Sequence, residues 1–277
     1  MFLTRLLSGI VLLAVAILSM SLGGIYLALI LWFISLIAYR ELTNALSCAT
    51  DNKKWNGLEI IGLIGVTAYY GMLYFWQDPQ MLLLGIVGVF LAEMFLYVIS
   101  FPKFQANQVV AAIFAFLYAP VMLSFVYLIR SADRGIYMVW MILISSWGCD
   151  TCAYAVGKLI GKKKIFPKLS PHKSLEGCIG GVAGTAALGA LYGHFLVQTA
   201  FPDRTVTWVI ALICGVGAVI SMVGDLAASA IKRNYNIKDY GKLIPGHGGI
   251  MDRFDSMIVT APMTYFLMVF LLKISSV

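Results

Sequence analysis

Residues 206–231 read VTWVIALICGVGAVISMVGDLAASAI, an apolar run with a single charged residue, Asp225. A helix of about 20 apolar residues is long enough to cross the ~30 Å hydrocarbon core of a bilayer. Similar runs recur along the chain, which is 61% hydrophobic and only 12% charged, about half the charged fraction of soluble domains. The runs lack the alternation of a membrane β-barrel. We therefore predict an all-α polytopic integral membrane protein without a separate soluble domain.

Hydropathy and turn residues together predict about nine transmembrane helices. We expect them at 6–21, 24–39, 60–76, 81–100, 109–129, 136–160, 177–197, 206–231 and 257–274. The first two are short and are separated only by Ser21-Leu-Gly-Gly24, so a re-entrant pair is an alternative there. With nine spans, 16 of the 20 Lys and Arg residues fall on the side of the N-terminus. Because basic loops are retained in the cytoplasm, we predict a cytoplasmic N-terminus.

The chain divides into two regions of different expected role. Residues 1–135 contain generic apolar spans, which we interpret as a scaffold with oligomer contacts. Residues 136–277 are the predicted catalytic region. The six glycines between 177 and 193 are interpreted as sites of close helix packing. The five cysteines, including the pair Cys149 and Cys152, are interpreted as packing residues rather than a disulfide framework or metal site.

Residues 229–255, the signature segment, concentrate charge of both signs in 27 positions. This concentration within an apolar protein predicts an ionic substrate. Immediately before it, Asp225 is followed by Ser229, Lys232 and Arg233 at helical spacing, which places a polar stripe along one helix face. The two cations alone could simply mark a membrane interface. A carboxylate at depth, however, costs several kcal/mol unless it has a partner.

Asp252 and Asp255 stand at i and i+3 at the start of the last predicted span, on one helix face. With Asp225 they could surround a hard divalent cation, and Mg²⁺ suits best because it takes one or two carboxylates plus phosphates and water. The alternative is that Arg253 and neighbouring lysines merely neutralise them. In Pro245-Gly-His-Gly-Gly249, the glycines allow backbone N–H groups to approach an anion near His247, or form an ordinary tight turn.

A second basic loop covers residues 161–176. Lys162 to Lys164 are expected to sit on anionic headgroups. Ser170-Pro171 resembles an N-cap followed by a first-turn proline, which predicts a helix start there. The first turns would then carry Lys173, Ser174 and Glu176, either as a phosphate site or as a plain helix start.

Two acidic residues stand inside predicted spans. Asp150 lies ten residues, or about 15 Å, from the cytoplasmic end of its span, and is a candidate functional residue. Glu93 is nearer the end of its span, where Tyr97, one turn away, could partner it.

The signature segment resembles that of the phosphatidate cytidylyltransferases, or CDP-diacylglycerol synthases. Its pattern is S-x-apolar-K-R, then K-D, then P-G-H-G-G-x-x-D-R-x-D. The matching positions are Ser229, Lys232, Arg233, Lys238, Asp239, Gly241, Pro245, His247, Gly248, Gly249, Asp252, Arg253 and Asp255. Residues 147–154 and 170–177 also resemble the family, so the resemblance covers roughly residues 140–270.

The resemblance implies transfer of a cytidylyl group from CTP to phosphatidic acid. Mg²⁺ is the hypothesised cofactor, and Asp150 could anchor a second cation or orient a basic side chain. The resemblance further implies an inner-membrane protein with a cytoplasmic active site, assembling as a homodimer. The hypothesised metal ligands are Asp225, Asp252 and Asp255, and the hypothesised phosphate-binding cations are Lys232, Arg233, Lys238 and Arg253. Further substrate contacts are assigned to Lys173, Ser174, Glu176, Ser229, Asp239, His247, Gly248 and Gly249.

Other classes of protein fit the residues less well. A CDP-alcohol phosphotransferase would carry D-G-x-x-A-R, but Asp225 is followed by Leu-Ala-Ala. An ion- or proton-coupled secondary transporter could use Asp150 and Glu93, yet the conspicuous charges lie at one membrane face. A lipid-binding scaffold leaves the buried carboxylates without a purpose. Nucleic-acid binding is not expected, because the asymmetry of the loops already accounts for the net charge of +7.

Overall fold

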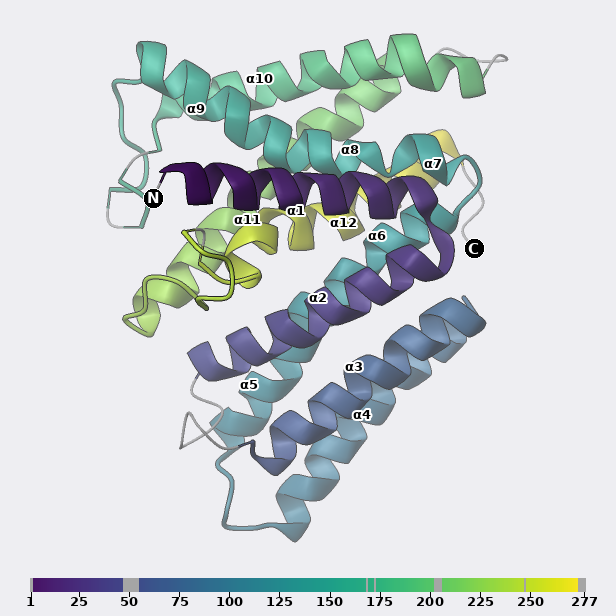
Figure 1. Cartoon of the computed structure of the whole chain (residues 1–277), viewed down its shortest axis with the longest axis vertical. Helices are drawn as coiled ribbons and strands as arrows, with labels where there is room; N and C mark the ends of the chain where they lie inside the picture. The colour runs from purple at the N-terminus through teal and green to yellow at the C-terminus, as the bar shows by residue number, and fades with distance from the viewer. Residues whose placement is uncertain are drawn as a thin grey trace. The chain divides into compact units, whose positions relative to one another are not determined.

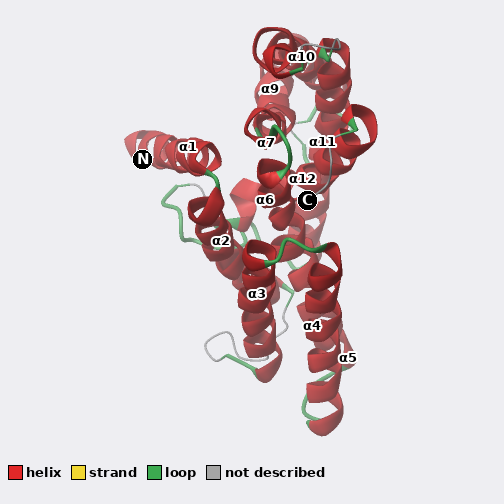
Figure 2. Cartoon of the chain, turned by 90° about the vertical axis from the view of Figure 1, so that its right-hand side faces the viewer, coloured by secondary structure: helices red, strands yellow, loops and turns green. Residues whose placement is uncertain are grey.

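The computed structural model of the chain describes residues 2–46, 55–167, 169–171, 173–201, 206–246 and 248–273. Throughout these ranges the regular elements are helices, and Figure 2 draws helices and loops without a strand. Isolated backbone bridges join Lys164 to Ser174 and Ile244 to Gly248. The predicted all-α class is therefore confirmed.

Nine helical segments succeed one another in the described ranges, and each overlaps a predicted span. They are α1 (Phe2–Leu22), α2 (Gly24–Ala45), α3 (Gly57–Phe75), α4 (Pro79–Ile99), α5–η1–α6 (Ala106–Phe116, Leu117–Val121, Met122–Ser131), α7–α8–η2–α9 (Gly135–Met138, Trp140–Leu143, Ile144–Gly148, Cys149–Ile160), α10–η3–η4 (Leu175–Tyr192, Gly193–Val197, Gln198–Ala200), α11 (Thr207–Asn234) and α12 (Met251–Leu272). Eight are long and apolar enough to cross a membrane, while α1 contributes the shorter apolar stretch Leu7–Leu22. The protein is thus a polytopic integral membrane protein. The number of crossings and the side of the N-terminus stay predictions.

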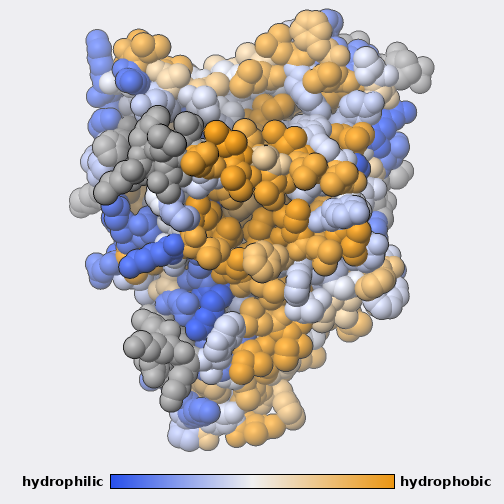
Figure 3. Space-filling view, in the orientation of Figure 1, coloured by the Kyte–Doolittle hydropathy of each residue, from blue (hydrophilic) through white to orange (hydrophobic). Residues whose placement is uncertain are grey.

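Large apolar side chains are exposed on many helices, including Leu18, Phe95 and Trp208. The face drawn in Figure 3 is largely hydrophobic, with hydrophilic residues gathered mainly along its left side and fewer at its right edge. Such extensive apolar exposure is unusual for a soluble monomer. It is the surface expected of helices whose outer faces contact lipid.

Two helix starts differ from the prediction. Helix α10 begins at Leu175 with Ser174 as its N-cap, so the helix start expected at Ser170-Pro171 is wrong. The Ser174 hydroxyl accepts a hydrogen bond from the Gly177 N–H at 3.2 Å. Before it, the N–H groups of Leu169 and Ser170 donate to the Phe166 carbonyl in a turn. Helix α12 begins at Met251, six residues before the predicted span, so that Asp252 lies in its first turn.

The chain divides into two compact units, which are described separately. Unit 1 comprises residues 1–127, 235–254 and 277, and unit 2 comprises residues 128–234 and 255–276. Residues 235–254 of the signature segment therefore pack with N-terminal helices. The functional division into a scaffold (1–135) and a catalytic region (136–277) stays a prediction.

In unit 1, α3 packs against both α2 and α4, and Figure 1 shows α3 and α4 side by side. Tyr39 of α2 is fully buried against Gly62 of α3, where any larger side chain would overlap its ring. Tyr69 of α3 meets the ring of Phe116 edge-on, with the centroids 6.0 Å apart. The first contact sets the end of α2 against α3, and the second sets α3 against α5.

In unit 2, α10 packs against both α9 and α11. A Cβ atom placed at Gly184 would lie 2.8 Å from the Cys152 sulfur of α9, and one at Gly189 would lie 2.7 Å from Cys214 Cβ of α11. The glycines therefore permit close helix approach, as predicted. The four described cysteines are free thiols, which agrees with a packing role.

Candidate active site

The candidate residues of unit 2 include the polar stripe of α11. One continuous helix, Thr207–Asn234, carries Asp225, Ser229, Lys232 and Arg233, so the predicted stripe on a single helix is confirmed. Asp225 and Ser229 are half-buried, as is Lys232, whereas Arg233 is exposed. The two cations occupy the last turn of the helix, where they interact favourably with its negative end.

Asp225 has the partner that a carboxylate inside a membrane helix requires. Lys173 Nζ lies 2.5 Å from Asp225 Oδ2, and the two side chains are 21% and 30% exposed. The contact is an ion pair rather than a well-aligned hydrogen bond. It ties the second basic loop to α11, which agrees with the expectation that this loop approaches the site.

A pocket with a volume of about 400 Å³ opens beside this ion pair within unit 2. We call it the lysine pocket, after the three cations on its wall, Lys158, Lys164 and Lys173. The other lining residues are Asp150, Ala153, Tyr154, Gly157, Ser174, Gly177, Cys178 and Met222. The volume lies in the range typical of small-molecule sites, and the excess of cations suits an anionic ligand. The structure thus brings Asp150 of α9 together with Lys173 and Ser174 of the second basic loop.

Backbone pairing shapes the rim of the lysine pocket. The Leu175 N–H donates to the Lys163 carbonyl at 2.8 Å, and Lys164 forms an extended bridge with Ser174. The Glu176 carboxylate accepts the N–H groups of Lys162 and Lys163 at 3.0 Å and 3.2 Å. Glu176 therefore holds the basic loop through its backbone, and the loop in turn places Lys164 on the pocket wall.

Glycines surround Ser174 at the base of the pocket. A Cβ atom at Gly157 or Gly177 would lie 3.3 Å or 3.0 Å from Ser174 Oγ. Ser174 itself is only 3% exposed. Its hydroxyl is thus committed to capping α10, and the pocket presents mainly its lysines and Asp150.

Three carboxylates of unit 2 act on one another. Asp150 and Asp225 lie within electrostatic reach of the buried Asp255 carboxylate, and Lys232 offsets their repulsion. Helices α11 and α12 approach closely here, because a Cβ atom at Gly224 would lie 3.1 Å from the Asp255 carbonyl oxygen. Among the described residues, no three His, Cys, Asp or Glu side chains form a metal-binding group. Asp225 and Asp255 nevertheless fit the common Mg²⁺ arrangement, in which one or two carboxylates are completed by phosphates and water.

The candidate residues of unit 1 lie on and next to the signature loop, residues 235–250, which is described separately. Its fold depends on Asp252, whose Oδ2 accepts the N–H of Tyr240 at 2.8 Å and that of Gly249 at 3.0 Å. A Cβ atom at Gly248 would lie 2.9 Å from the same oxygen, and the positive φ of 85° also favours glycine. Asp252 is buried, and its hydrogen bonds organise this loop. Its role as a metal ligand stays a prediction.

The remaining predicted residues are distributed as follows. Lys238 and Asp239 are exposed on the signature loop, Gly248 is half-buried and Gly249 is buried. Arg253 is half-buried, with its Nε lacking a hydrogen-bond partner within the part of the chain described. His247 lies outside the described residues.

Several residues of these sites were missed in the sequence. In the sequence, Lys158 and Lys164 resemble ordinary interfacial lysines. Only the structure places them on one pocket wall, where the backbone of Lys164 pairs with Ser174. Glu41 was also missed: its carboxylate accepts the N–H groups of Ile250 and Met251 at 3.1 Å and 2.8 Å. Conversely, Glu93 is buried without a hydrogen-bond partner in the described ranges, so the predicted pairing with Tyr97 is wrong.

Comparison with known proteins agrees with the predicted resemblance. Residues 3–271 match the family described as "Cytidylyltransferase family". Phosphatidate cytidylyltransferase of Haemophilus influenzae is 35% identical over 198 residues, which is 68% of each chain. The protein of that name from Thermotoga maritima is 34% identical over 71% of each chain. The one from Staphylococcus saprophyticus is 29% identical over 89% of this chain and 91% of its own. The chain belongs to the cytidylyltransferase family of enzymes.

Proposed function

We propose that this enzyme is a phosphatidate cytidylyltransferase, which converts CTP and phosphatidic acid to CDP-diacylglycerol and pyrophosphate. The observation that carries the proposal is the lysine pocket, where three cations and Asp150 adjoin the Lys173–Asp225 ion pair. Relatives named phosphatidate cytidylyltransferase support the choice of substrates. The apolar helices agree with a substrate delivered from the bilayer.

The reaction makes modest chemical demands on the protein. An oxygen of the lipid phosphate forms a bond to the α-phosphorus of CTP, and the bond from that phosphorus to the bridging oxygen of the β-phosphate breaks. Pyrophosphate leaves with the electron pair. Because the attacking oxygen is already anionic at neutral pH, no general base is needed. The protein has to position two polyanions and neutralise their charge.

The lysines meet this demand in the proposal. Lys158, Lys164 and Lys173 hold phosphate oxygens in the pocket, while Asp225 keeps the Lys173 ammonium group oriented. Lys232, Arg233, Lys238 and Arg253, together with His247, complete the phosphate contacts. Ser229, Asp239, Gly248 and Gly249 are proposed substrate contacts. Glu176 acts by holding the basic loop.

Mg²⁺ is the proposed cofactor. Asp225 and Asp255 would hold it, with Asp252 as the further predicted ligand and Asp150 as the anchor of a second cation. When bound, the ion supplies charge neutralisation at the phosphates. The donor chemistry supports this, since all four side chains are hard oxygen ligands.

The decisive assay uses the purified protein in detergent micelles with phosphatidic acid, Mg²⁺ and CTP radiolabelled at the α-phosphate. We expect labelled CDP-diacylglycerol in the lipid phase and unlabelled pyrophosphate in the aqueous phase, with no product after EDTA treatment. Lack of lipid-linked label at saturating CTP and Mg²⁺ would overturn the proposal. A secondary transporter has no observation in its favour.

We also propose an inner-membrane location with a cytoplasmic active site, and assembly as a homodimer. The distribution of basic loops supports the orientation, and the family resemblance supports the dimer. Labelling of single cysteines placed in the loops at 162 and 238 by a membrane-impermeant maleimide tests the orientation. Modification only after the membrane is opened is the expected result. The mass of the purified protein in micelles, after subtraction of the bound detergent, tests the dimer.

A further inference from the structure

Glu41 lies at the end of α2 and is only 7% exposed, although it carries a carboxylate. Both of its oxygens are occupied by backbone donors 209 and 210 residues away. Oε1 accepts the N–H of Ile250, and Oε2 accepts the N–H of Met251. These donors belong to the start of α12, where helix N–H groups lack partners within the helix. A carboxylate at this position also interacts favourably with the positive end of the helix.

The signature loop encloses the Glu41 carboxylate on two sides. A Cβ atom at Gly241 would overlap Oε1, and one at Gly249 would overlap both oxygens. Only glycine therefore allows the loop backbone to approach so closely. Gly241 precedes Pro245 in the sequence and Gly249 follows it, so both ends of the signature loop lie against the Glu41 carboxylate.

Glu41 and Asp252 share the task of holding one short turn. The N–H of Gly249 donates to Asp252, and the next two N–H groups donate to Glu41. Three successive backbone donors are thus held by two carboxylates, one of which is the predicted metal ligand. Without the Glu41 carboxylate, the turn that carries Asp252 loses two of these three bonds.

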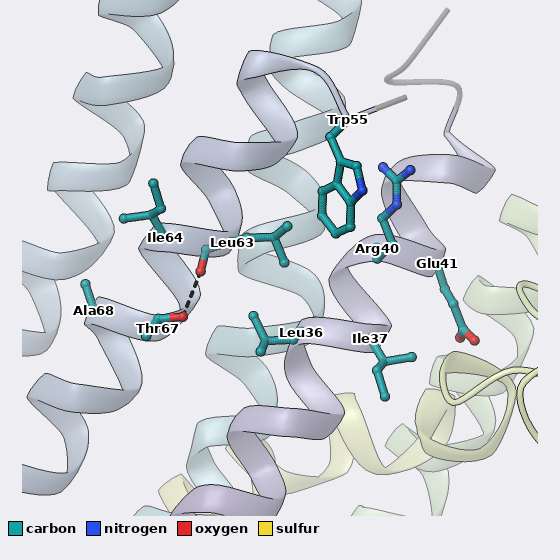
Figure 4. Close-up of a pocket in the computed structure, with 9 residues that line it drawn as sticks. All are labelled: Leu36, Ile37, Arg40, Glu41, Trp55, Leu63, Ile64, Thr67 and Ala68. Atoms are coloured by element: carbon teal, nitrogen blue, oxygen red, sulfur yellow. Dashed lines mark hydrogen bonds between the residues drawn. The ribbon is translucent and has the colours of Figure 1, made fainter. Parts of the chain in front are cut away.

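The base of Glu41 is itself fixed. The preceding residue, Arg40, forms an ion pair with the fully buried Glu59 at the start of α3, and its guanidinium lies 4.4 Å from the centre of the Trp55 ring. Figure 4 shows Arg40 and Glu41 diverging from α2, Arg40 toward Trp55 and Glu41 away from it. Adjacent residues of α2 thus bind α3 and the signature loop respectively.

We propose that Glu41 is a positioning residue of the cytidylyltransferase site: it holds the turn at residues 249–251 and thereby fixes the place of Asp252. The inference rests on the proposed function for its kinetic consequence, and on geometry alone for its effect on the loop. Glu41 does not contact substrate in this proposal.

The test compares Glu41→Gln with Glu93→Gln, the same substitution at a buried glutamate on α4 of unit 1 whose carboxylate accepts no hydrogen bond from the described residues. The amide introduced at position 41 presents one acceptor where two were needed, and its NH₂ group opposes a backbone donor. For Glu41→Gln we expect kcat to fall at least tenfold with a smaller change in KM for CTP, and the Mg²⁺ concentration for half-activation to rise. For Glu93→Gln we expect kcat within twofold of wild type.

Hydrogen–deuterium exchange on the same preparations separates the inference from the proposed function. Amides 249–251 should exchange at least tenfold faster in Glu41→Gln and remain unchanged in Glu93→Gln, whether or not the protein makes CDP-diacylglycerol. If exchange at these amides stays at the wild-type level, Glu41 does not hold the turn. If exchange rises while kcat per folded enzyme is unchanged, Glu41 is structural only and the positioning role is overturned.

A second variant guards against misfolding of Glu41→Gln. Gly249→Ala leaves Glu41 in place but drives a methyl group into its carboxylate, whereas Gly71→Ala adds a methyl group where no atom lies within 4 Å. We expect Gly249→Ala to reproduce the loss of kcat and the faster exchange, and Gly71→Ala to do neither. In the double variant the two effects should not add, because both disrupt one contact. Wild-type kcat in Gly249→Ala would refute the proposal.

Discussion

The Lys173–Asp225 ion pair allows a catalytic role to be separated from a structural one. Lys173→Met keeps the apolar stem of the side chain and removes only the charge. Both side chains are mostly buried, at 21% and 30% exposed, and the substitution leaves the Asp225 carboxylate without its partner. The expected loss of stability therefore lies between the about 0–1 kcal/mol of an exposed pair and the about 3–5 kcal/mol of a buried one. Each kcal/mol corresponds to a fall in Tm of about 2–4 °C for a chain of this size.

Catalysis should respond much more strongly to the same change. A fixed cation that neutralises charge developing on phosphate is worth about 10²–10³-fold in kcat, as for other preorganised electrostatic groups. We therefore expect kcat/KM for CTP to fall about 100-fold or more in Lys173→Met, while Lys173→Arg retains part of it. Exchanging the two charges, with Lys173→Asp and Asp225→Lys together, should not restore activity, because the cation would leave the pocket wall.

The assay measures kcat/KM for CTP and for phosphatidic acid in mixed micelles at saturating Mg²⁺, with thermal unfolding of the same samples. Lys103→Met is the matched control, since Lys103 lies over the Phe104 ring in unit 1 and has no proposed contact with substrate. Activity of Lys173→Met within threefold of wild type, with Tm lowered by more than 5 °C, would show that the pair is purely structural. That result would refute the reasoning.

Three further changes test other parts of the structure. Asp252→Asn should lower kcat at least 100-fold, and full activity at saturating Mg²⁺ would remove Asp252 from the site. The asparagine oxygen still accepts hydrogen bonds from Tyr240 and Gly249, so we expect a loss of only about 1–2 kcal/mol of stability in a denaturation assay. Ser174→Ala removes the cap of α10 and should cost about 1 kcal/mol of stability, whereas Ser174→Thr should retain most of it; an unchanged melting curve would contradict the cap. Gly184→Val would press a side chain into Cys152 and should lower the free energy of unfolding by about 1–3 kcal/mol. Gly88→Ala, whose methyl group meets no atom within 4 Å, should be neutral. Equal Tm values for the two variants would contradict close packing of α9 and α10.

The membrane helices could be predicted because their cause is local. Backbone groups in hydrocarbon must bond within their own segment, so any run of about 20 apolar residues becomes a helix whatever its neighbours are. The polar stripe from Asp225 to Arg233 was predictable for the same reason, since one helix sets the spacing of all its members. Helix ends were less certain. Helix α10 begins after Ser174 rather than after Ser170, because the Ser174 hydroxyl accepts the free N–H of Gly177.

The sequence by itself determined the fold class, the approximate spans and the residue types that a reaction between two polyanions requires. Only the tertiary structure decided which of these residues meet. Lys173 faces Asp225 because the second basic loop folds back against α11, and Lys164 joins the pocket because its backbone pairs with Ser174. Glu41 had no local signal at all: its role arises from two N–H groups that are 209 and 210 residues away. Hydropathy is a property of each segment, whereas a site held by ion pairs and hydrogen bonds between segments exists only after they have packed.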